Sequence, residues 1–344
     1  MTLSCALLTH TDPAPPALTY CGAMKHLTSR WRFVHAEKPH SMKSKILETL
    51  GSRVLVADGG MGTELQRLGL EPGVCGDLWN LECPEKVRSV HDAYVAAGAE
   101  LITTNTFRGN RLALRQYGLE SQVAAVNHAA ASIAREAAGD RAWVVGSVGP
   151  FGGFIEPLGE TSSEEVYAGF FEQATALLEG GVDAILIETM TAVEELDIAI
   201  GAAHDAGAPL VIATMAFDQV RDGYKTMMGV SPEQGAETAL KSGAQIFGCN
   251  CGAHLELQDY VELCKQLRTC FEGPLLVQPN AGQPELLSGE IIYGLTPVRM
   301  AAVVKGLISA GASIIGGCCG TTPEHIRLIV DAVRASEEKI RRHL

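Results

Sequence analysis

The sequence has no excess of basic residues. It holds 27 Lys and Arg against 40 Asp and Glu, which gives 344 residues a formal net charge of −13. A nucleic acid or an acidic lipid surface would require a basic patch on its protein partner. The composition therefore argues against a nucleic-acid partner and against a membrane partner.

Long apolar runs and a secretory leader are also missing. No run of about 18 apolar residues is long enough to cross a bilayer, and no segment has the residue order of a signal peptide. We therefore expect a compact, soluble, cytoplasmic protein. In reducing surroundings, clustered cysteines are more often metal ligands or catalytic groups than disulfides, and this chain has ten cysteines.

Residues 1–41 differ from the rest of the chain. Four of the 15 prolines lie in this stretch, which has almost no acidic residues and no clear periodicity. We predict a disordered amino-terminal extension, followed by one folded domain over residues 42–344. A basic, acid-poor amino terminus also fits an organellar transit peptide, although the low serine content counts against that alternative.

Short apolar or β-branched runs alternate with longer amphipathic stretches from residue 54 onward. This alternation predicts repeated strand–helix units around a parallel sheet. The predicted strands are residues 54–58, 101–105, 143–148, 184–188, 210–215, 245–250, 275–278 and 313–315. Eight units over about 280 residues favour an α/β fold of the closed (β/α)8 TIM barrel type over a doubly wound sheet.

Helix start and stop signals lie between the predicted strands. Starts are indicated by Pro84, by the Thr and Ser residues at 161–163, by Ser231-Pro232 and by Thr296-Pro297. Several of the expected helices end in a glycine just before the next strand, namely Gly98, Gly181, Gly207, Gly243 and Gly311. Such a glycine supplies the left-handed stop that a short helix-to-strand loop needs.

Polar and reactive residues gather where the predicted strands end. In a TIM barrel these carboxyl ends carry the chemistry. The candidate substrate-binding residues there are Asp58, Gly59, Gly60, Asn105, Glu188 and Asn280. The strand bodies are apolar, and such a division would be unexpected if these ends merely held the fold together.

Three cysteines at these ends predict a metal site. Cys318 and Cys319 are adjacent and would face opposite ways in a regular strand, but the glycines around them permit a sharp turn that brings both sulfurs to one side. Cys251 ends the sixth predicted strand, two positions round the barrel from the eighth, and alternate strands share a layer. We predict that these three residues hold one catalytic Zn²⁺.

The fourth position and two alternatives stay open at this point. A catalytic zinc site has three protein ligands and one open corner, which we expect Asn280 to occupy until a substrate displaces it. Cys249 is a rival to Cys251 as a ligand, because it lies two residues earlier on the same strand. The Cys318-Cys319 pair is otherwise an inert pair or a vicinal disulfide.

The charge of the predicted site favours thiol chemistry. Three thiolates on Zn²⁺ make a unit of formal charge −1, which activates water less well than histidine-rich hydrolytic zinc. Coordination deprotonates a bound thiol outright, and an alkyl group is the natural electrophile. None of the ten histidines lies at a predicted strand end, which argues against a metal-dependent hydrolase.

Several motifs together resemble a known family. They are residues 58–65, 104–107, 248–251, 279–282 and 316–325. In this order, over residues from about 45 to 338, they resemble the homocysteine S-methyltransferase family, and most closely the homocysteine-binding module of cobalamin-dependent methionine synthase.

The resemblance implies a zinc-dependent S-methyltransferase of the EC 2.1.1 class that methylates homocysteine to give methionine. It implies Cys251, Cys318 and Cys319 as zinc ligands, in preference to Cys249. It also implies that Asp58 and Glu188 face the substrate ammonium, while the glycine-rich turn at residues 59–62 holds the carboxylate. From the residues alone, Asp58 is otherwise a helix cap and Glu188 otherwise part of a salt bridge.

The methyl donor is not fixed by the resemblance. S-methylmethionine and methylcobalamin on a separate protein are both compatible, whereas betaine is disfavoured because Met61 stands where betaine enzymes carry an aromatic residue. Four aromatic residues are candidates for a donor pocket, with packing as their default role: Trp79, Phe107, Phe151 and Tyr293. The alternatives are a barrel subunit that docks a corrinoid protein and a methyltransferase that acts on another thiol.

Overall fold

The computed structural model describes residues 45–287 and 290–341, so the predicted extension at residues 1–41 lies outside the described residues. The strands of the main sheet are β1 (Leu55–Val56), β2 (Leu101–Thr103), β3 (Trp143–Val148), β4 (Ala184–Met190), β5 (Val211–Met215), β8 (Ile246–Asn250), β9 (Leu275–Gln278) and β12 (Ala312–Ile315). Each begins and ends within two residues of its predicted bounds.

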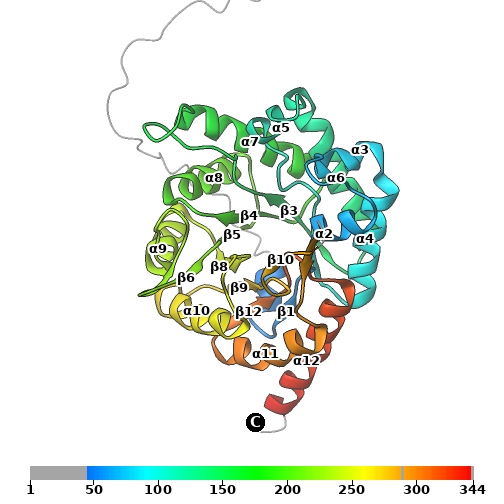
Figure 1. Cartoon of the computed structure of the whole chain (residues 1–344), viewed down its shortest axis with the longest axis vertical. Coiled ribbons are helices and arrows are strands. Elements are labelled where there is room, and N and C mark those ends of the chain that lie inside the picture. The colour runs from blue at the N-terminus through cyan, green and yellow to red at the C-terminus, as the bar shows by residue number, and fades with distance from the viewer. Residues whose placement is uncertain (1–44, 288–289, 342–344) are drawn as a thin grey trace, which may run out of the picture. The chain divides into compact units, whose positions relative to one another are not determined.

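These eight strands form one parallel sheet that closes on itself. Their order is β1-β12-β9-β8-β5-β4-β3-β2, so each strand lies beside its neighbours in the chain. A bridge between Ala57, just after β1, and Leu101 in β2 joins the two ends of that order. The fold is therefore the predicted (β/α)8 TIM barrel, with its helices in an outer ring (Figure 1).

The helices of the outer ring follow the strands. They are α4 (Pro84–Ala97), α6 (Val123–Ala138), α7 (Ser163–Glu179), α8 (Val193–Asp205), α9 (Pro232–Ser242), α10 (Leu257–Cys270), α11 (Pro297–Ser309) and α12 (Pro323–Arg341). None of the helices in the described ranges is long and apolar enough to cross a membrane.

The predicted helix signals act as expected. Ser162 and Thr296 accept hydrogen bonds from the first turns of α7 and α11, and Ser231 forms a capping box with Gln234 at the start of α9. Such caps satisfy backbone donors that the helix leaves unpaired. Gly243 ends α9 with a φ of 93°, a conformation that glycine adopts without steric cost.

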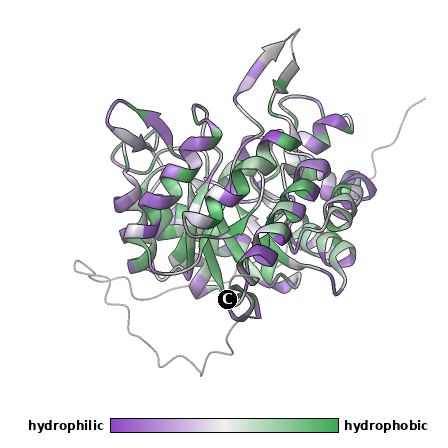
Figure 2. Cartoon of the chain, turned by 90° about the horizontal axis from the view of Figure 1, so that it is seen from below, coloured by the Kyte–Doolittle hydropathy of each residue, from purple (hydrophilic) through white to green (hydrophobic). Residues whose placement is uncertain are grey.

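Shorter elements occupy the loops. They are α1 (Lys45–Leu50), α2 (Met61–Arg67), η1 (Gly76–Leu78), α3 (Trp79–Glu82), α5 (Arg111–Arg115), η2 (Glu120–Gln122), and the hairpin strands β6 (Asp218–Val220), β7 (Gly223–Lys225), β10 (Pro284–Leu287) and β11 (Glu290–Tyr293). The sequence analysis predicted neither hairpin. Figure 2 shows the β10–β11 hairpin standing away from the barrel.

The barrel interior is filled by one apolar layer. Every strand of the sheet contributes to it, with Leu55, Leu101, Val145, Leu186, Ile212, Ile246, Leu276 and Ile314. Ile46 of α1 is fully buried in the same cluster, so α1 closes the amino-terminal end of the barrel. Burial of each such side chain contributes about 1.5–3 kcal/mol, and with this end filled, access to the interior is from the carboxyl ends of the strands.

Candidate metal and substrate site

A polar layer lies directly above the apolar one. On six strands, a polar residue follows the apolar residue of that layer by two positions, or by four positions on β8. These inward-facing polar residues are Thr103, Ser147, Glu188, Thr214, Asn250 and Gln278. Strand alternation sends both layers to the same face of the sheet. The sequence analysis selected only Glu188 from this set, although counting by two from each buried Leu, Ile or Val finds the others.

Three cysteine sulfurs meet at this end of the barrel. The Sγ atoms of Cys251, Cys318 and Cys319 all lie within 4.8 Å of one another, and those of Cys318 and Cys319 are 3.9 Å apart. Sulfurs at two corners of a tetrahedral Zn²⁺ site, with Zn–S of about 2.3 Å, lie about 3.8 Å apart. The spacing fits zinc, and these cysteines are free thiols, so no vicinal disulfide is present.

The conformation of Cys251 brings its sulfur to the cluster. Phe247 and Cys249 of β8 pack into the core between sheet and helices, so regular alternation would send Cys251 the same way. Cys251 instead has a φ of 58°, and its carbonyl accepts a hydrogen bond from the Tyr260 hydroxyl. Cys249 is buried, with its thiol pKa raised by burial, and lies outside the cluster.

Backbone hydrogen bonds fix the loop that carries the other two cysteines. The Cys318 N–H donates to the Pro279 carbonyl at 2.9 Å, and the Ala281 N–H donates to the Cys319 carbonyl at 2.9 Å. The Thr321 hydroxyl donates to the Cys318 carbonyl at 2.6 Å. The loop after β12 is thus tied to the loop after β9, which holds both sulfurs on one side.

Asn280 lies beside the cluster and contacts both cysteine segments. Its Nδ2 donates to the Gly252 carbonyl at 2.8 Å and lies 3.7 Å from the Cys251 sulfur. Its Oδ1 accepts the Cys319 N–H at 3.1 Å. We expected Asn280 at the fourth corner of the metal site, but its side-chain oxygen is engaged by the Cys319 N–H in this structure.

The pKa values of the three cysteine thiols indicate that the cluster suits a cation. Hydrogen bonds from the Cys318 and Cys319 thiols lower the pKa of Cys251, and the same contacts raise the pKa values of Cys318 and Cys319. Sulfurs this close cannot all carry negative charge unless a positive charge lies among them. The donor set therefore fits a thiolate-binding metal such as zinc.

Two carboxyl groups, of the buried Asp58 and the half-buried Glu188, lie in the same end of the barrel. Asp58 accepts the Thr103 N–H at 2.7 Å and the Thr103 hydroxyl, so it does not cap a helix. Glu188 accepts hydrogen bonds from the Ser147 hydroxyl and, at 3.3 Å, from Asn250. Its carboxylate makes no ion pair within the described ranges.

Both acids favour a positively charged ligand. Burial is the main cause that raises the pKa of Asp58 to about 8, with a smaller contribution from the charge of Glu188. Burial is also the main cause that raises the pKa of Glu188 to about 7. A cation beside the two carboxyl groups would restore their ionised forms, and an alkylammonium group is a cation of suitable chemistry.

Gly59 and Gly60 allow the first loop to press against the cysteine loop. A Cβ on Gly59 would lie 2.8 Å from the Tyr94 hydroxyl, and one on Gly60 would lie 2.7 Å from the Cys318 carbonyl oxygen. The Gly60 N–H donates to the Thr321 hydroxyl at 3.0 Å. A carboxylate cradle in this turn would therefore use the N–H groups that follow Gly60 at the start of α2.

Asn105 lies at the end of β2 and holds a neighbouring loop. Its Nδ2 donates to the Gly76 carbonyl at 2.8 Å and to the Asn80 side chain at 3.2 Å. The side chain is buried. Its amide nitrogen is thus used to fix the segment that contains η1 and α3 against the rim of the barrel.

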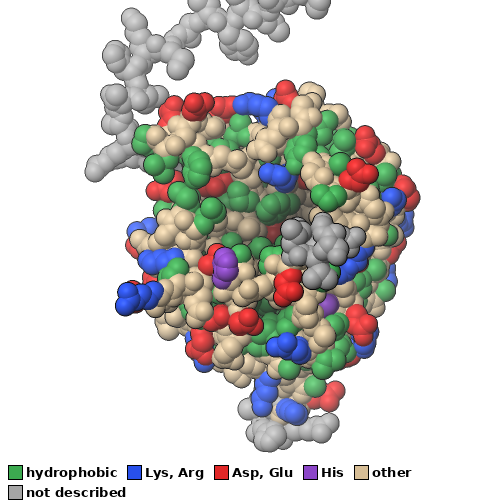
Figure 3. All heavy atoms as spheres, in the orientation of Figure 1, with side chains coloured by type: hydrophobic (Ala, Val, Ile, Leu, Met, Phe, Trp, Pro, Cys, Tyr) green, Lys and Arg blue, Asp and Glu red, His purple; other side chains and the backbone are tan. Residues whose placement is uncertain are grey.

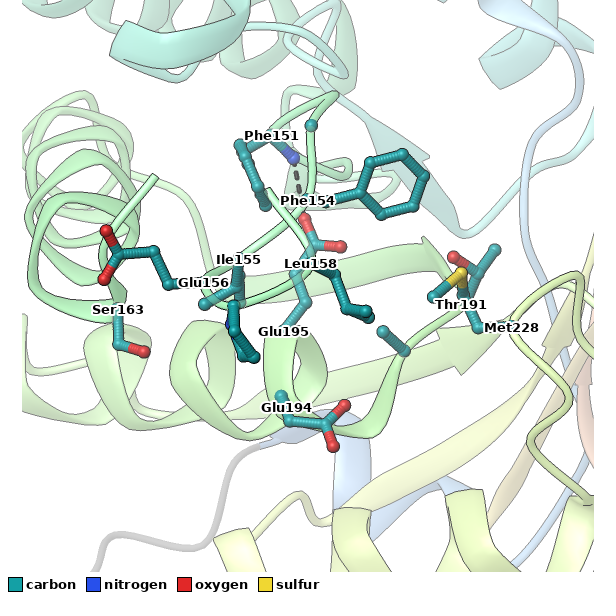
Figure 4. A pocket seen from close by; sticks show the side chains of 13 residues that line it. Phe151, Phe154, Ile155, Glu156, Leu158, Ser163, Thr191, Glu194, Glu195 and Met228 are labelled. Atoms are coloured by element: carbon teal, nitrogen blue, oxygen red, sulfur yellow. Dashed lines mark hydrogen bonds between the residues drawn. The ribbon is translucent and has the colours of Figure 1, made fainter. Parts of the chain in front are cut away.

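A pocket of about 230 Å³ lies at the rim, between the loop after β3 and the start of α8 (Figure 4). Its walls are largely apolar and include Phe151 and Met228. Glu195 lies in it, buried, with its carboxylate accepting the Phe151 N–H at 2.8 Å. Of the four aromatic residues considered for a donor pocket, only Phe151 lines this one.

Comparison with known proteins identifies the family. The sequence model of the family described as homocysteine S-methyltransferase matches residues 55–333. The chain belongs to this family. The motifs at its strand ends indicate the same family, and the predicted resemblance is confirmed.

Relatives of known identity agree with this assignment. Methionine synthase of Mycobacterium leprae is 34% identical over 319 residues, and that of Mycobacterium tuberculosis is 32% identical over 316 residues. Each match covers 87% of this chain and 26% of the relative, so the chain spans about a quarter of the length of these relatives.

A solved structure matches over nearly its whole length. It is the metallated form of the homocysteine methyltransferase MmuM from Escherichia coli, with a TM-score of 0.66 and 26% identity. The match covers 82% of this chain and 97% of MmuM. The likeness to MmuM therefore extends over nearly the whole of that solved chain.

Proposed function

We propose that this chain transfers a methyl group to the thiol of homocysteine to give methionine, with one Zn²⁺ bound by Cys251, Cys318 and Cys319. The observation that carries the proposal is that three cysteine sulfurs lie within 4.8 Å of one another at the end of the barrel that also holds Asp58 and Glu188. A metal held by the three cysteines would bind the thiol of an amino-thiol, and the two acids would bind its ammonium group. MmuM, a homocysteine methyltransferase solved in a metallated form, supports the same assignment.

The metal supplies one part of the chemistry. Cys251, Cys318 and Cys319 would hold Zn²⁺, and the ion would supply the positive charge that keeps a substrate thiol deprotonated at neutral pH. The loops after β8, β9 and β12 hold the three cysteines in place through Asn280 and the backbone hydrogen bonds around Cys318. This rigid support limits the reorganisation that substrate binding requires.

The two acids orient the substrate. Asp58 and Glu188 accept the ammonium group of homocysteine, and that positive charge lowers the pKa of both carboxyl groups. The N–H groups that follow Gly60 at the start of α2 hold the substrate carboxylate. With both polar groups of the amino acid fixed, the side chain extends toward the cysteine cluster.

The transfer itself needs no covalent intermediate with the protein. An electron pair on the substrate sulfur forms the new S–CH₃ bond, while the bond between the methyl group and the donor breaks and its electron pair leaves with the donor. The chain contributes by alignment of the sulfur with the donor and by exclusion of competing nucleophiles.

The test is a donor screen with labelled methyl groups. Zinc-loaded protein is incubated with homocysteine and S-methylmethionine that carries a deuterated methyl, and the methionine formed is analysed by mass spectrometry. We expect deuterated methionine from wild type and none from Cys318→Ser. Absence of methionine with every donor tried, including a methylated corrinoid protein, would contradict the proposal.

A second candidate, a barrel subunit that receives the methyl group from a separate corrinoid protein, is favoured by the surface. Phe107, Leu158 and Met227 follow β2, β3 and the β6–β7 hairpin and are 39%, 75% and 77% exposed. Figure 3 shows hydrophobic side chains around a hollow on this face. Exposed apolar groups around a site favour a docked protein, and turnover only with a methylated corrinoid protein would select this form.

We also propose that the protein works in a reducing compartment, the cytoplasm. All eight cysteines within the described ranges are free thiols. Oxidation of the Cys318-Cys319 pair would remove two metal ligands. Zinc content measured before and after treatment with a thiol oxidant tests this requirement, because the proposal predicts release of the metal on oxidation.

A further inference from the structure

Asn250 ends β8, one residue before Cys251, and is 1% exposed. Its Oδ1 accepts the Thr189 N–H at 3.0 Å and the Thr214 hydroxyl at 2.7 Å. Because a backbone N–H can only donate, the atom that faces it must be the amide oxygen. The orientation of the Asn250 side chain is therefore fixed, and its nitrogen faces the other way.

The nitrogen of Asn250 has more acceptors than hydrogens. Its Nδ2 lies 2.8 Å from the Thr189 hydroxyl, 3.3 Å from Glu188 Oε2 and 3.9 Å from Cys318 Sγ. An amide nitrogen carries two hydrogens, and the short contact to Thr189 takes one of them. Glu188 and Cys318 therefore share the other, so one N–H lies between the ammonium-binding acid and a metal cysteine.

Backbone strain surrounds the same side chain. Thr189 and Cys251 are the non-glycine residues with positive φ in the described ranges, at 63° and 58°. Asn250 hydrogen-bonds to the first and is joined by a peptide bond to the second. A β-branched residue rarely adopts this conformation, and such strain persists where the surroundings hold it in place, most often at functional sites.

We propose that Asn250 is a positioning residue that couples recognition of the substrate ammonium to the metal cysteines, and so sets the preference for an amino-thiol over a simple thiol. This role rests on the proposed function. When an ammonium group binds Glu188, it replaces the shared N–H at that carboxylate. The N–H is then left to the Cys318 sulfur alone, so binding of an ammonium group at Glu188 strengthens the contact between Asn250 and that sulfur.

Thr214 offers a milder way to disturb the same network. Its hydroxyl bonds to the Asn250 oxygen, and Thr214→Val keeps the shape of the side chain while it removes that bond. A matched control is Asn127→Ala in α6, because Asn127 is also a buried amide whose nitrogen makes two hydrogen bonds, to the carbonyls of Gly109 and Val123.

The experiment compares two thiols by calorimetric titration of zinc-loaded protein. They are homocysteine and 4-mercaptobutanoate, which has the same thiol and carboxylate but no amine. We expect wild type to prefer homocysteine. In Asn250→Ala this preference falls by about tenfold, through weaker homocysteine binding alone. Thr214→Val shows a smaller change in the same direction, and Asn127→Ala loses stability but keeps the wild-type preference.

The outcomes distinguish failure of the role of Asn250 from failure of the proposed function. Equal weakening of both thiols in Asn250→Ala, or an unchanged preference in both network variants, overturns the coupling role. If Asn250→Ala does not retain zinc, the preference of Thr214→Val decides. A wild-type protein that binds homocysteine no better than 4-mercaptobutanoate overturns the proposed function itself, and the role of Asn250 with it.

Discussion

The amide nitrogen of Asn280 lies 3.7 Å from the sulfur of Cys251. The oxygen of the same side chain accepts the Cys319 N–H at 3.1 Å. Cys251 and Cys319 are 68 residues apart in the chain (319 − 251), yet one side chain bonds to both of their segments. Residues that hold metal ligands in this way affect metal affinity without being ligands.

Asn280→Ala should weaken zinc binding by about 10- to 100-fold, the usual effect of the loss of such a support. Without the Asn280 side chain, the segments of Cys251 and Cys319 lose their shared hydrogen-bond partner, and the distance between their sulfurs increases. Competition with a chromophoric chelator measures the affinity. Asn127→Ala is the control for loss of a buried amide elsewhere, and an unchanged affinity in Asn280→Ala would show that the backbone contacts suffice.

Cys318→Ser should lose both zinc and activity. A serine hydroxyl is a poor ligand at neutral pH because it remains protonated, unlike a thiol on zinc. Metal analysis of purified protein checks this, with Cys249→Ser as the control that keeps its zinc because Cys249 lies in the core and outside the cluster. Full activity in a zinc-free Cys318→Ser protein would rule out the assigned site.

Glu188→Gln should raise the KM for homocysteine by about tenfold or more, since it removes the charge that pairs with the ammonium group. Zinc content should stay at the wild-type value. Glu195→Gln is a matched control, because burial raises the pKa of that acid to about 7 as well, but it lies in the rim pocket. A KM that rises equally in both variants would contradict specific recognition by Glu188.

Asp58→Asn should change how stability depends on pH in the absence of substrate. The pKa of Asp58 is about 8 in the folded protein and about 4 in an unfolded chain. Between these values the folded state binds more protons, so the free energy of unfolding of wild type falls as pH rises from about 4 to 8.

The asparagine does not titrate, so Asp58→Asn should gain melting temperature relative to wild type across that pH window. Thermal unfolding at its two ends measures the difference. If the two proteins show the same pH dependence, the buried carboxyl group is ionised already and the raised pKa is wrong.

His91→Leu should stabilise the fold. His91 is fully buried in α4, and neither ring nitrogen has a hydrogen-bond partner. Burial lowers its pKa to about 4, below the value of about 6.5 in an unfolded chain. The leucine removes an unsatisfied polar group, which is worth about 1–3 kcal/mol.

The effect of His91→Leu should also grow in acid. For wild type, the contribution of neutral His91 is complete above about pH 6.5 and is lost as pH falls toward 4, whereas leucine does not titrate. Chemical denaturation at pH 7 and pH 5 tests both statements. A variant less stable than wild type at both values would indicate a packing role that leucine does not fill.

Local signals in the sequence predicted much of the fold. The capping box of Ser231 and Gln234 and the left-handed stop at Gly243 depend on a few neighbouring residues, and so does the alternation within each strand. The β6–β7 hairpin was missed because its strands have three residues each. Such short strands carry no periodic pattern, and their pairing depends on the surrounding loops.

The sequence by itself determined which residues end the strands, and therefore that three cysteines, two acids and Asn280 gather at one end of a barrel. It did so because strand periodicity and helix caps are local. Only the tertiary structure decided where each side chain points. Cys251 turns inward through its positive φ, and Asn250 links Glu188 to Cys318, because contacts between strands far apart in the chain hold both residues in place.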